Sequence, residues 1–235
     1  MKLELNKDYN FLIPYDVPML RVGDIGDCGY VIAKKSLRAT NLISLGLGTN
    51  WSFDKQWLEL NPVSVIHGYD GTIFPEEFPE ELKKEYKSFF KGQVVHFTEN
   101  VSASNIDQIL KRVSGDTFLK MDIEGSEYDL ISSISKANHL IGLAIEFHAL
   151  DLENCKNKFK SAIELLSADY KIVHVHANNF GGICEDSLPH TLVISFLRKD
   201  LCKTEKKRHD CYLEGLDSPN ALNSEEYKLY FIREE

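Results

Sequence analysis

Long apolar runs are missing from this sequence, and their absence limits where the protein can reside. No stretch approaches the ~20 apolar residues that cross a bilayer, so we expect no membrane span. The chain starts Met1-Lys2-Leu3-Glu4, and no apolar run follows these charges, so we expect no secretory signal. A cytoplasmic location is therefore expected.

Paired cysteines are missing as well. The sequence has 5 cysteines, an odd number, and no two of them form a C-x-x-C pair. Their spacing matches neither a disulfide framework nor a structural zinc site. Free thiols in a reducing compartment are expected, which agrees with a cytoplasmic location.

Positive charge is scarce, and this argues against one class of partner. Lys and Arg number 27 against 36 Asp and Glu, for a net charge of −9. Proteins that bind phosphate backbones use clustered basic side chains to displace counterions. The short basic run 203–208 is interrupted by Glu205 and is expected to be a solvated loop. We therefore predict no nucleic-acid partner.

Short apolar runs alternate with amphipathic stretches along the chain. Strands are expected at 41–45, 63–69, 94–97, 117–121, 140–147, 170–175 and 191–197. Helices are expected at 51–60, 79–90, 104–113, 127–134 and 155–166. This alternation predicts an α/β fold with a mostly parallel sheet and helices on both faces. The last two strands lack an intervening helix, which suggests an antiparallel end. We expect an N-terminal cap, 1–37, and one domain, 38–235.

A glycine turn follows the first predicted strand. Gly46 and Gly48 let the backbone turn sharply and approach a ligand closely. Asp70 comes about 20 residues later, where the hydroxyl pair of a ribose needs an acceptor. A tight strand-to-helix turn is the structural alternative, but the combination favours a nucleoside ligand. Trp51 stands where a dinucleotide motif has its third glycine, which disfavours NAD without excluding an NAD-dependent oxidoreductase.

Titratable side chains gather at the ends of three later strands. Asp122 and Glu124 follow strand 117–121, Glu146 and His148 share one side at the end of the next strand, and His176 ends another. Ligands of doubly wound sheets bind at these carboxyl ends. Histidine and carboxylates can accept a proton from an alcohol or bind a divalent metal. The cluster therefore predicts an active site.

Structural roles remain the alternative for part of this region. Ser126 or Glu124 can cap the helix that follows, and Glu127 can complement its dipole. A single histidine at a strand end is more often structural than functional. Two such strand ends beside carboxylates favour a site.

The stretch 119–131, LKMDIEGSEYDLI, resembles the signature of FkbM-type methyltransferases. Further segments resemble one branch of that family: 22–32, 44–53, 69–73, 145–150 and 174–181. The resemblance implies a single-domain, seven-stranded, Rossmann-like class I methyltransferase fold. It also implies S-adenosylmethionine as donor and, in many members, a hydroxyl of a sugar or glycan as acceptor. We expect a small-molecule sugar or nucleotide sugar as the substrate, with the methyl group transferred to oxygen. The sequence departs from the pattern at Cys28, Ser44 and Asn50, which concern the methionine end of the cofactor.

We assign roles on this basis. The expected cofactor-binding residues are Tyr30, Gly46, Gly48, Ser52, Asp70 and Asp122. The expected catalytic residues are Asp122, Glu124, His148 and His176. Asn178 and Asn179 are expected to bind the substrate. A divalent Mg²⁺ or Mn²⁺ ion held by Asp122, Glu146 and His148 is the alternative to a free histidine base. A non-catalytic interaction domain is the remaining alternative to an enzyme.

Overall fold

The computed structural model describes residues 1–70, 72, 86–91 and 103–232. Its central sheet has the strand order β6-β5-β4-β7-β8-β10-β9. The strands are β4 (Asn41–Leu45), β5 (Val65–Asp70), β6 (Tyr86–Lys91), β7 (Thr117–Met121), β8 (Leu140–Phe147), β9 (Tyr170–Ala177) and β10 (Leu192–Arg198). Neighbours from β6 to β8 pair in parallel, and β10 runs antiparallel to both β8 and β9. The expected α/β fold with a mostly parallel sheet is confirmed.

The register of the central strands places the predicted site residues at one edge of the sheet. Leu45 on β4 pairs with Tyr69 on β5 and with Met121 on β7. The residues that directly follow these three are Gly46 after β4, Asp70 as the last residue of β5, and Asp122 after β7. Three segments far apart in sequence thus meet at the carboxyl edge.

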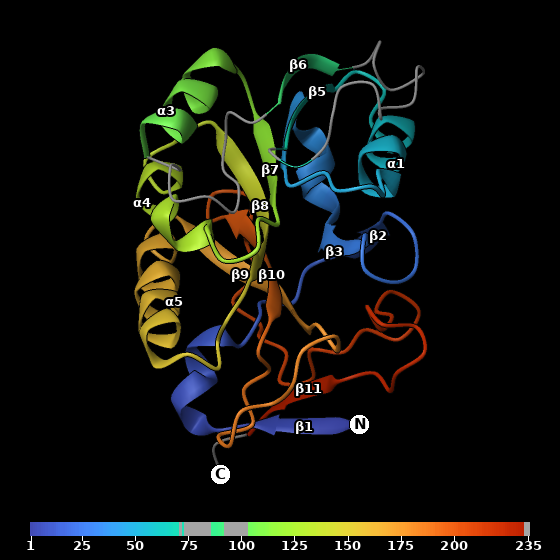
Figure 1. Cartoon of the computed structure of the whole chain (residues 1–235), viewed down its shortest axis with the longest axis vertical. Helices are drawn as coiled ribbons and strands as arrows, with labels where there is room; N and C mark the ends of the chain where they lie inside the picture. Colours follow the sequence, from blue (N-terminus) through green and yellow to red (C-terminus); the bar gives the residue numbers. More distant parts are fainter. Residues whose placement is uncertain (71, 73–85, 92–102, 233–235) are drawn as a thin grey trace.

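Helices cover both faces of the sheet (Figure 1). They are α1 (Ser52–Leu60) on one face and α3 (Ala103–Arg112), α4 (Ile131–Ile134) and α5 (Glu153–Leu166) on the other. Successive strand residues point to opposite faces, so Ile43 packs in the core under α3 to α5. Leu42 packs in the core on the other side, with Phe53 and Trp57 of α1. These two side chains lie one turn apart on α1, which explains its amphipathic pattern.

The first part of the N-terminal segment packs in the core under α3 to α5, and its later part packs in the core beside α1. It contains β1 (Lys2–Leu5), η1 (Lys7–Leu12), the antiparallel pair β2 (Met19–Val22) and β3 (Tyr30–Ala33), and η2 (Lys34–Arg38). Ser195 of β10 donates a 2.7 Å hydrogen bond to the carbonyl of Val31, which fixes β3 against the sheet. This contact brings Tyr30 close to the carboxyl edge.

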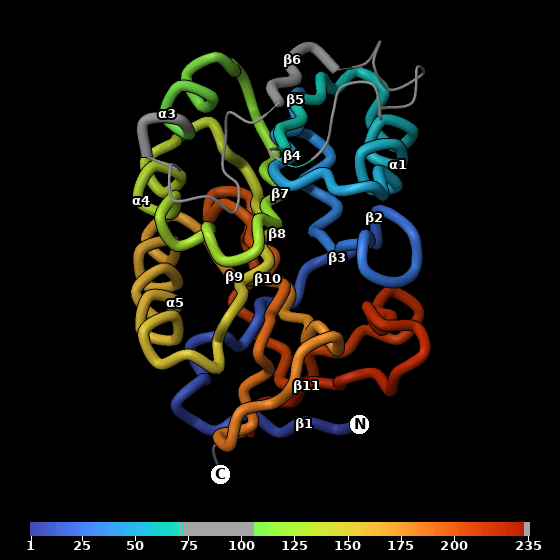
Figure 2. Tube along the Cα trace, viewed as in Figure 1, coloured from blue at the N-terminus to red at the C-terminus, as the bar shows by residue number. Residues whose placement is uncertain are grey.

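Strand β1 pairs in parallel with β11 (Lys228–Phe231), near the other end of the chain. The two strands lie side by side at one end of the molecule (Figure 2). Strand β11 was not among the predicted strands, because local periodicity does not report a pairing partner more than 200 residues away.

Two expected helices are corrected. Residues 86–90 of the predicted helix 79–90 belong to β6, and its remaining residues lie outside the described part, as does the predicted strand 94–97. A short aromatic run fits helical and strand periods alike, and pairing with β5 decides between them. The predicted helix 127–134 is a 3-10 turn, η4 (Glu127–Asp129), followed by the short α4.

Every helix within the described residues falls short of the length and apolar character that a membrane crossing requires.

Candidate functional site

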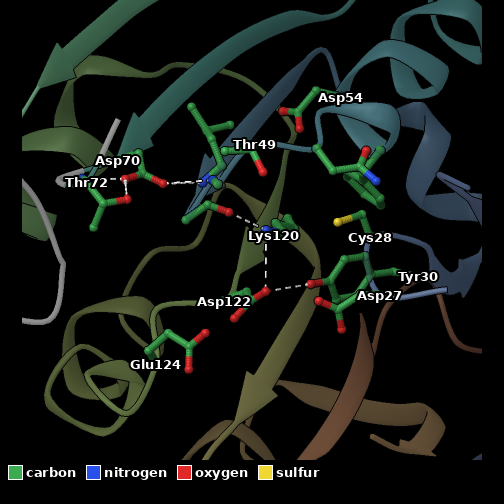
Figure 3. A pocket seen from close by; sticks show the side chains of 15 residues that line it. Asp27, Cys28, Tyr30, Thr49, Asp54, Asp70, Thr72, Lys120, Asp122 and Glu124 are labelled. Carbon is green, nitrogen blue, oxygen red and sulfur yellow. Dashed lines mark hydrogen bonds and ion pairs between the residues drawn. The ribbon is translucent and has the colours of Figure 1, made fainter. Parts of the chain in front are cut away.

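A cavity opens at the carboxyl edge of the sheet (Figure 3). Its walls come from the segment before β3, the turn 46–50, the start of α1, and the residues that end β5 and β7. The cavity measures about 320 Å³, which is within the roughly 300–1,000 Å³ typical of small-molecule sites. Most of the predicted cofactor-binding residues line it, namely Tyr30, Gly46, Gly48, Asp70 and Asp122.

The two glycines of the turn have different roles. Both have positive φ, +78° at Gly46 and +58° at Gly48, which L side chains rarely adopt. A Cβ at Gly46 would lie 1.6 Å from the carbonyl oxygen of Asp122, so this glycine permits close approach of the β4 and β7 ends. A Cβ at Gly48 would meet no atom within 4 Å. Gly48 therefore keeps its part of the wall open to the cavity.

Asp70 holds the glycine turn through its carboxylate. Oδ2 accepts hydrogen bonds from the amides of Leu47 (2.8 Å) and Gly48 (2.9 Å). Oδ1 accepts two 2.6 Å bonds from the amide and hydroxyl of Thr72. Burial alone would raise the pKa of Asp70, but these hydrogen bonds outweigh it and lower the pKa. The expected acceptor for ribose hydroxyls therefore lines the cavity while already binding four protein donors.

Lys120 is a cavity residue to which the sequence analysis gave no role. It lies on β7, and its side chain is only 8% exposed. Nζ donates to the carbonyl of Gly46 and lies 3.9 Å from Asp122 Oδ2. The sequence does contain a sign of this role, which is a lysine inside the apolar strand TFLKM. A buried ammonium is costly without a partner or a ligand, so a lysine at such a position indicates a site.

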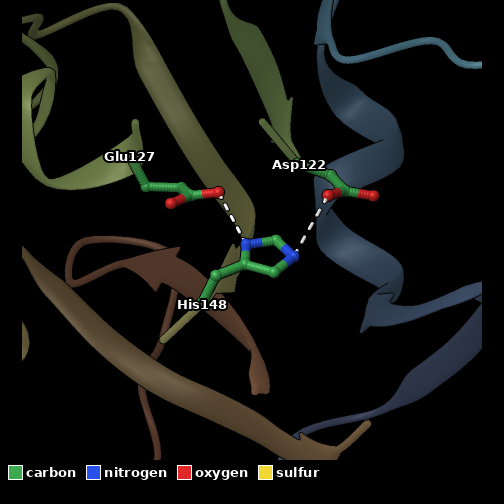
Figure 4. A group of neighbouring side chains, drawn as sticks. All are labelled: Asp122, Glu127 and His148. Carbon is green, nitrogen blue, oxygen red and sulfur yellow. Dashed lines mark hydrogen bonds and ion pairs between the residues drawn. The ribbon is translucent and has the colours of Figure 1, made fainter. Parts of the chain in front are cut away.

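Four carboxylates lie around the imidazole of His148, and Figure 4 draws two of them, Glu127 and Asp122. Nδ1 lies 2.8 Å from Glu127 Oε1. Nε2 lies 3.5 Å from Glu124, 3.7 Å from Asp122 and 3.9 Å from Glu146. Burial by itself would lower the pKa of His148, but the hydrogen bond to Glu127 and the other carboxylates raise it to about 9. The imidazole is therefore mainly protonated at neutral pH.

Glu127 positions His148, a role different from the helix-dipole role considered for it. Its side chain is fully buried, and Oε1 also accepts from the amides of Ile123 and Gly125. Glu124, between these amides, has a φ of +55°, which is strained for a residue with a side chain. The tight turn after β7 thus wraps around the Glu127 carboxylate.

The described residues that could hold a metal ion differ from the expected set. Asp122, Glu127 and His148 each offer a ligand atom, and these atoms lie within 4.8 Å of one another. Glu127 therefore takes the place that the sequence analysis gave to Glu146. The second oxygen of Glu127, Oε2, is buried and has no hydrogen-bond partner among the described residues. Oε1 is the oxygen that faces His148, so the fit of a divalent ion rests on the carboxylate and imidazole donors of these three residues.

Glu146 is buried beside the cavity and shares a hydrogen-bond network with Tyr30. The Tyr30 hydroxyl lies 3.1 Å from Asp122 Oδ2 and 3.4 Å from Glu146 Oε2. Asn178 donates a 2.6 Å hydrogen bond to the other Glu146 oxygen. Burial, followed by the charge of Asp122, raises the pKa of Glu146 to about 8. Burial also raises the pKa of Tyr30.

Two other predicted residues lie apart from the cavity lining. The ring of His176 on β9 contacts Glu226, with Nε2 3.3 Å from Oε1. The hydroxyl of Ser52 accepts a 3.1 Å hydrogen bond from the amide of Asp24. His176 thus binds the C-terminal segment, and Ser52 supports the loop before β3.

The two predicted substrate-binding asparagines are both buried and bound to the protein. Asn178 connects Glu146 with the amide of Phe180. Asn179 donates to the carbonyls of Ala221 and Glu225 and accepts from the amide of Ala221. Asn178 therefore supports the site through Glu146, and Asn179 anchors the C-terminal segment.

Some solved structures resemble the chain weakly. The fibrillarin pre-rRNA processing protein of Methanococcus jannaschii is 14% identical, with 84% of this chain and 87% of that chain covered and a TM-score of 0.43. The MycE methyltransferase of the mycinamycin pathway, in complex with Mg and SAH, is 14% identical, with 71% and 47% covered and a TM-score of 0.43. A precorrin-6y C5,15-methyltransferase from Geobacter metallireducens is 16% identical, with 70% and 85% covered and a TM-score of 0.39. These similarities are too low to transfer a substrate or a residue role.

The chain matches no curated protein sequence. A family model gives a clear result: the model described as the methyltransferase FkbM domain matches residues 26–172, more than half of the chain. The matched region contains the glycine turn, the Asp122 turn and the His148 strand. The chain therefore belongs to the FkbM methyltransferase family.

Proposed function

We propose that this protein transfers the methyl group of S-adenosylmethionine to a hydroxyl group of a sugar or nucleotide sugar. One observation supports this most directly: Asp122 lines the cavity beside the glycine turn and lies 3.7 Å from His148. The proposed donor pocket and the titratable cluster therefore share a residue. Methyl transfer needs this proximity, because the acceptor must attack and lose its proton at one place.

The donor side of the proposal rests on the turn and the charges of the cavity. Gly46 and Gly48 expose backbone at the end of β4, where a nucleoside can approach closely. The carboxylates of Asp122 and Glu124 line the same cavity and would stabilise a sulfonium. In the transfer, the acceptor oxygen bonds to the methyl carbon while the sulfur–carbon bond breaks, its electrons stay on sulfur, and the hydroxyl proton passes to a base.

The raised pKa of His148 favours a carboxylate as that base. A protonated imidazole cannot accept a proton, but it can hold Asp122 and Glu124 in place through charge. Asp122 is the carboxylate that contacts both the cavity and the Tyr30 hydroxyl. We assign Asp122 as the general base and His148 as its positioning partner.

A divalent ion is the second candidate for activating the hydroxyl, and the close grouping of three ligand atoms beside the cavity favours it. Asp122, Glu127 and His148 would hold Mg²⁺ or Mn²⁺. Such an ion lowers the pKa of a bound hydroxyl. Exhaustive chelation should then abolish turnover, and either ion should restore it, whereas full activity in chelator supports Asp122 as an unaided base.

The acceptor assignment rests on polar groups at the cavity. Glu124 is 66% exposed, and it lies 3.5 Å from Nε2 of the partly buried His148 ring. Asp27 also lines the cavity, so hydrogen-bond acceptors stand on two sides. A sugar has several hydroxyl donors and suits such a lining.

The test is methyl transfer to free and nucleotide-linked sugars, measured as a methyl ether formed together with S-adenosylhomocysteine. Efficient methylation of a protein or a phenol, with no sugar methylated, would overturn the acceptor and leave the methyltransferase. Calorimetry with NAD⁺ in parallel separates the alternatives. Binding of NAD⁺ alone would indicate an oxidoreductase, and binding of neither cofactor an interaction domain.

A further inference from the structure

Lys120 occupies an unusual position for a lysine, in the middle of the central sheet. On β7 it pairs with Ser44 of β4 and Ala144 of β8. Both neighbours are small and fully buried, so they leave room for the apolar stem of the lysine. The strands thus place the Lys120 side chain in the lining of the cavity (Figure 3).

The ammonium has more donors than the described protein groups use. Nζ has three N–H donors, and the Gly46 carbonyl is its hydrogen-bond acceptor among the described residues. Asp122 Oδ2 lies 3.9 Å away, beyond hydrogen-bonding distance, and the Tyr30 ring centroid lies 5.5 Å away. A buried cation with unused donors is costly unless a ligand completes its contacts. Lys120 is therefore suited to an anionic group inside the cavity.

The surrounding charges narrow the identity of that ligand. Within the described cavity lining, Lys120 is the one basic side chain. The acidic lining residues are Asp27, Asp54, Asp70, Asp122 and Glu124. The several carboxylates would repel a polyanion. A zwitterion with one carboxylate and one ammonium complements this lining, because its carboxylate can pair with Lys120 and its ammonium with the acidic side chains. The free end of an α-amino acid has this pair of charges.

We propose that Lys120 binds the α-carboxylate at the methionine end of S-adenosylmethionine. The inference rests on the proposed function, because it takes that cofactor as the ligand of the cavity. The ammonium of the same amino-acid end lies among the acidic side chains opposite Lys120. This contact supplies a recognition group at the end of the cofactor where Cys28, Ser44 and Asn50 depart from the family pattern.

The experiment compares two ligands that differ by one group. S-Adenosylhomocysteine has the α-carboxylate, and 5′-deoxy-5′-(3-aminopropylthio)adenosine lacks it but retains the amine. Calorimetry on the wild-type protein should show about 10- to 100-fold tighter binding of S-adenosylhomocysteine, as for a charge-assisted hydrogen bond. Lys120→Met should remove this preference, and Lys120→Arg should retain part of it. Lys111→Met, on the exposed side of α3, is the matched control and should change neither affinity.

The ratio of the two affinities separates recognition from a structural role. If Lys120 only held the Gly46 turn, Lys120→Met would weaken both ligands equally and keep the ratio, which would overturn the proposal. Equal wild-type affinities would overturn it too. If Lys120→Met does not fold, the ¹⁵N shift of the wild-type Lys120 Nζ decides, since it should move with S-adenosylhomocysteine and not with the decarboxylated ligand. Failure of both ligands to bind the wild-type protein would instead contradict the proposed function.

Discussion

At the scale of single residues, the site depends on carboxylates whose environments differ. Asp70 accepts four protein hydrogen bonds, which lower its pKa despite burial. Glu146 has one strong donor, Asn178, and burial raises its pKa to about 8. Environments that separate pKa values in this way are typical of sites that divide structural and proton-transfer roles among similar groups.

Replacing the proposed base should affect turnover more than cofactor binding. Asp122→Asn keeps the size of the side chain but removes its ability to take a proton, so methyl transfer should fall by roughly 10²- to 10⁴-fold. The Kd of S-adenosylhomocysteine should change only a few-fold, because that product has no sulfonium charge. Single-turnover kinetics and calorimetry measure the two effects. Asp129→Asn, at a surface ion pair with Lys158, is the control and should leave turnover unchanged. Unaltered turnover in Asp122→Asn would exclude Asp122 as the base.

Removing the Asp70 carboxylate should weaken the cofactor through the glycine turn. Asp70→Ala leaves the amides of Leu47 and Gly48 without their acceptor, and we expect a loss of roughly 1.5 to 3 kcal/mol in binding free energy. Titration with S-adenosylhomocysteine measures it. Because the proposed effect is on the turn, the loss should be similar for a 2′,3′-dideoxy analogue. A loss confined to the natural ligand would show direct binding of the ribose by Asp70, and undiminished affinity would remove Asp70 from the site.

At the scale of elements, the site is assembled by turns that follow parallel strands. The β4 turn and the β7 turn approach so closely that Gly46 has no room for a Cβ beside Asp122. The β7 turn is held in turn by the buried Glu127. The two turns therefore act as one unit that sets the distance between donor pocket and base.

Two glycine substitutions should separate strand packing from cavity access. Gly46→Ala places a methyl group 1.6 Å from the Asp122 carbonyl, so the free energy of unfolding should fall by about 3 kcal/mol or more. Gly48→Ala meets no atom within 4 Å and should cost only about 1–2 kcal/mol for its positive φ. Urea unfolding measures both. Equal losses in the two variants would contradict the packing role of Gly46.

At the scale of the whole molecule, the C-terminal segment closes the structure over β9. The ring of His174 on β9 lies 2.9 Å from Asp217, and both side chains are almost completely buried. Asn179 binds the same segment at Ala221 and Glu225. Strand β11 then completes the connection by pairing with β1. The C-terminal segment is therefore held by contacts with both β9 and the N-terminal strand β1.

Acid should loosen this connection. Burial alone would raise the pKa of Asp217, but the charge and hydrogen bond of His174 outweigh it, so the folded pKa lies below the usual value. The resulting stability is complete above the unfolded pKa, roughly 4, and is lost as the pH falls through the folded pKa. Asp217→Asn should therefore lower Tm near pH 6 and make Tm less dependent on pH below about 5. Thermal unfolding across this range tests it, with the exposed Asp151→Asn as control. An unchanged acid slope in Asp217→Asn would refute the assignment.

Local pattern alone determined much of the sheet. Strands 41–45, 117–121 and 140–147 were predicted with the bounds that the structure has, because continuous apolar runs of this length fit buried parallel strands. The residues directly after these runs, such as Gly46 and Asp122, could be placed at one edge because parallel strands share their carboxyl ends. The sequence therefore predicted those site residues whose position depends only on where a strand ends.

The tertiary structure decided which of these side chains meet. Glu127 turns inward to His148, and Lys120 reaches the cavity between two small neighbours. His176, chosen by the same rule as His148, contacts the C-terminal segment instead. The pairing of β6 with β5 likewise overrode a helical pattern. Sequence periodicity reports which face of an element is buried, whereas a side chain's partner depends on elements brought alongside from distant parts of the chain, and only packing determines these.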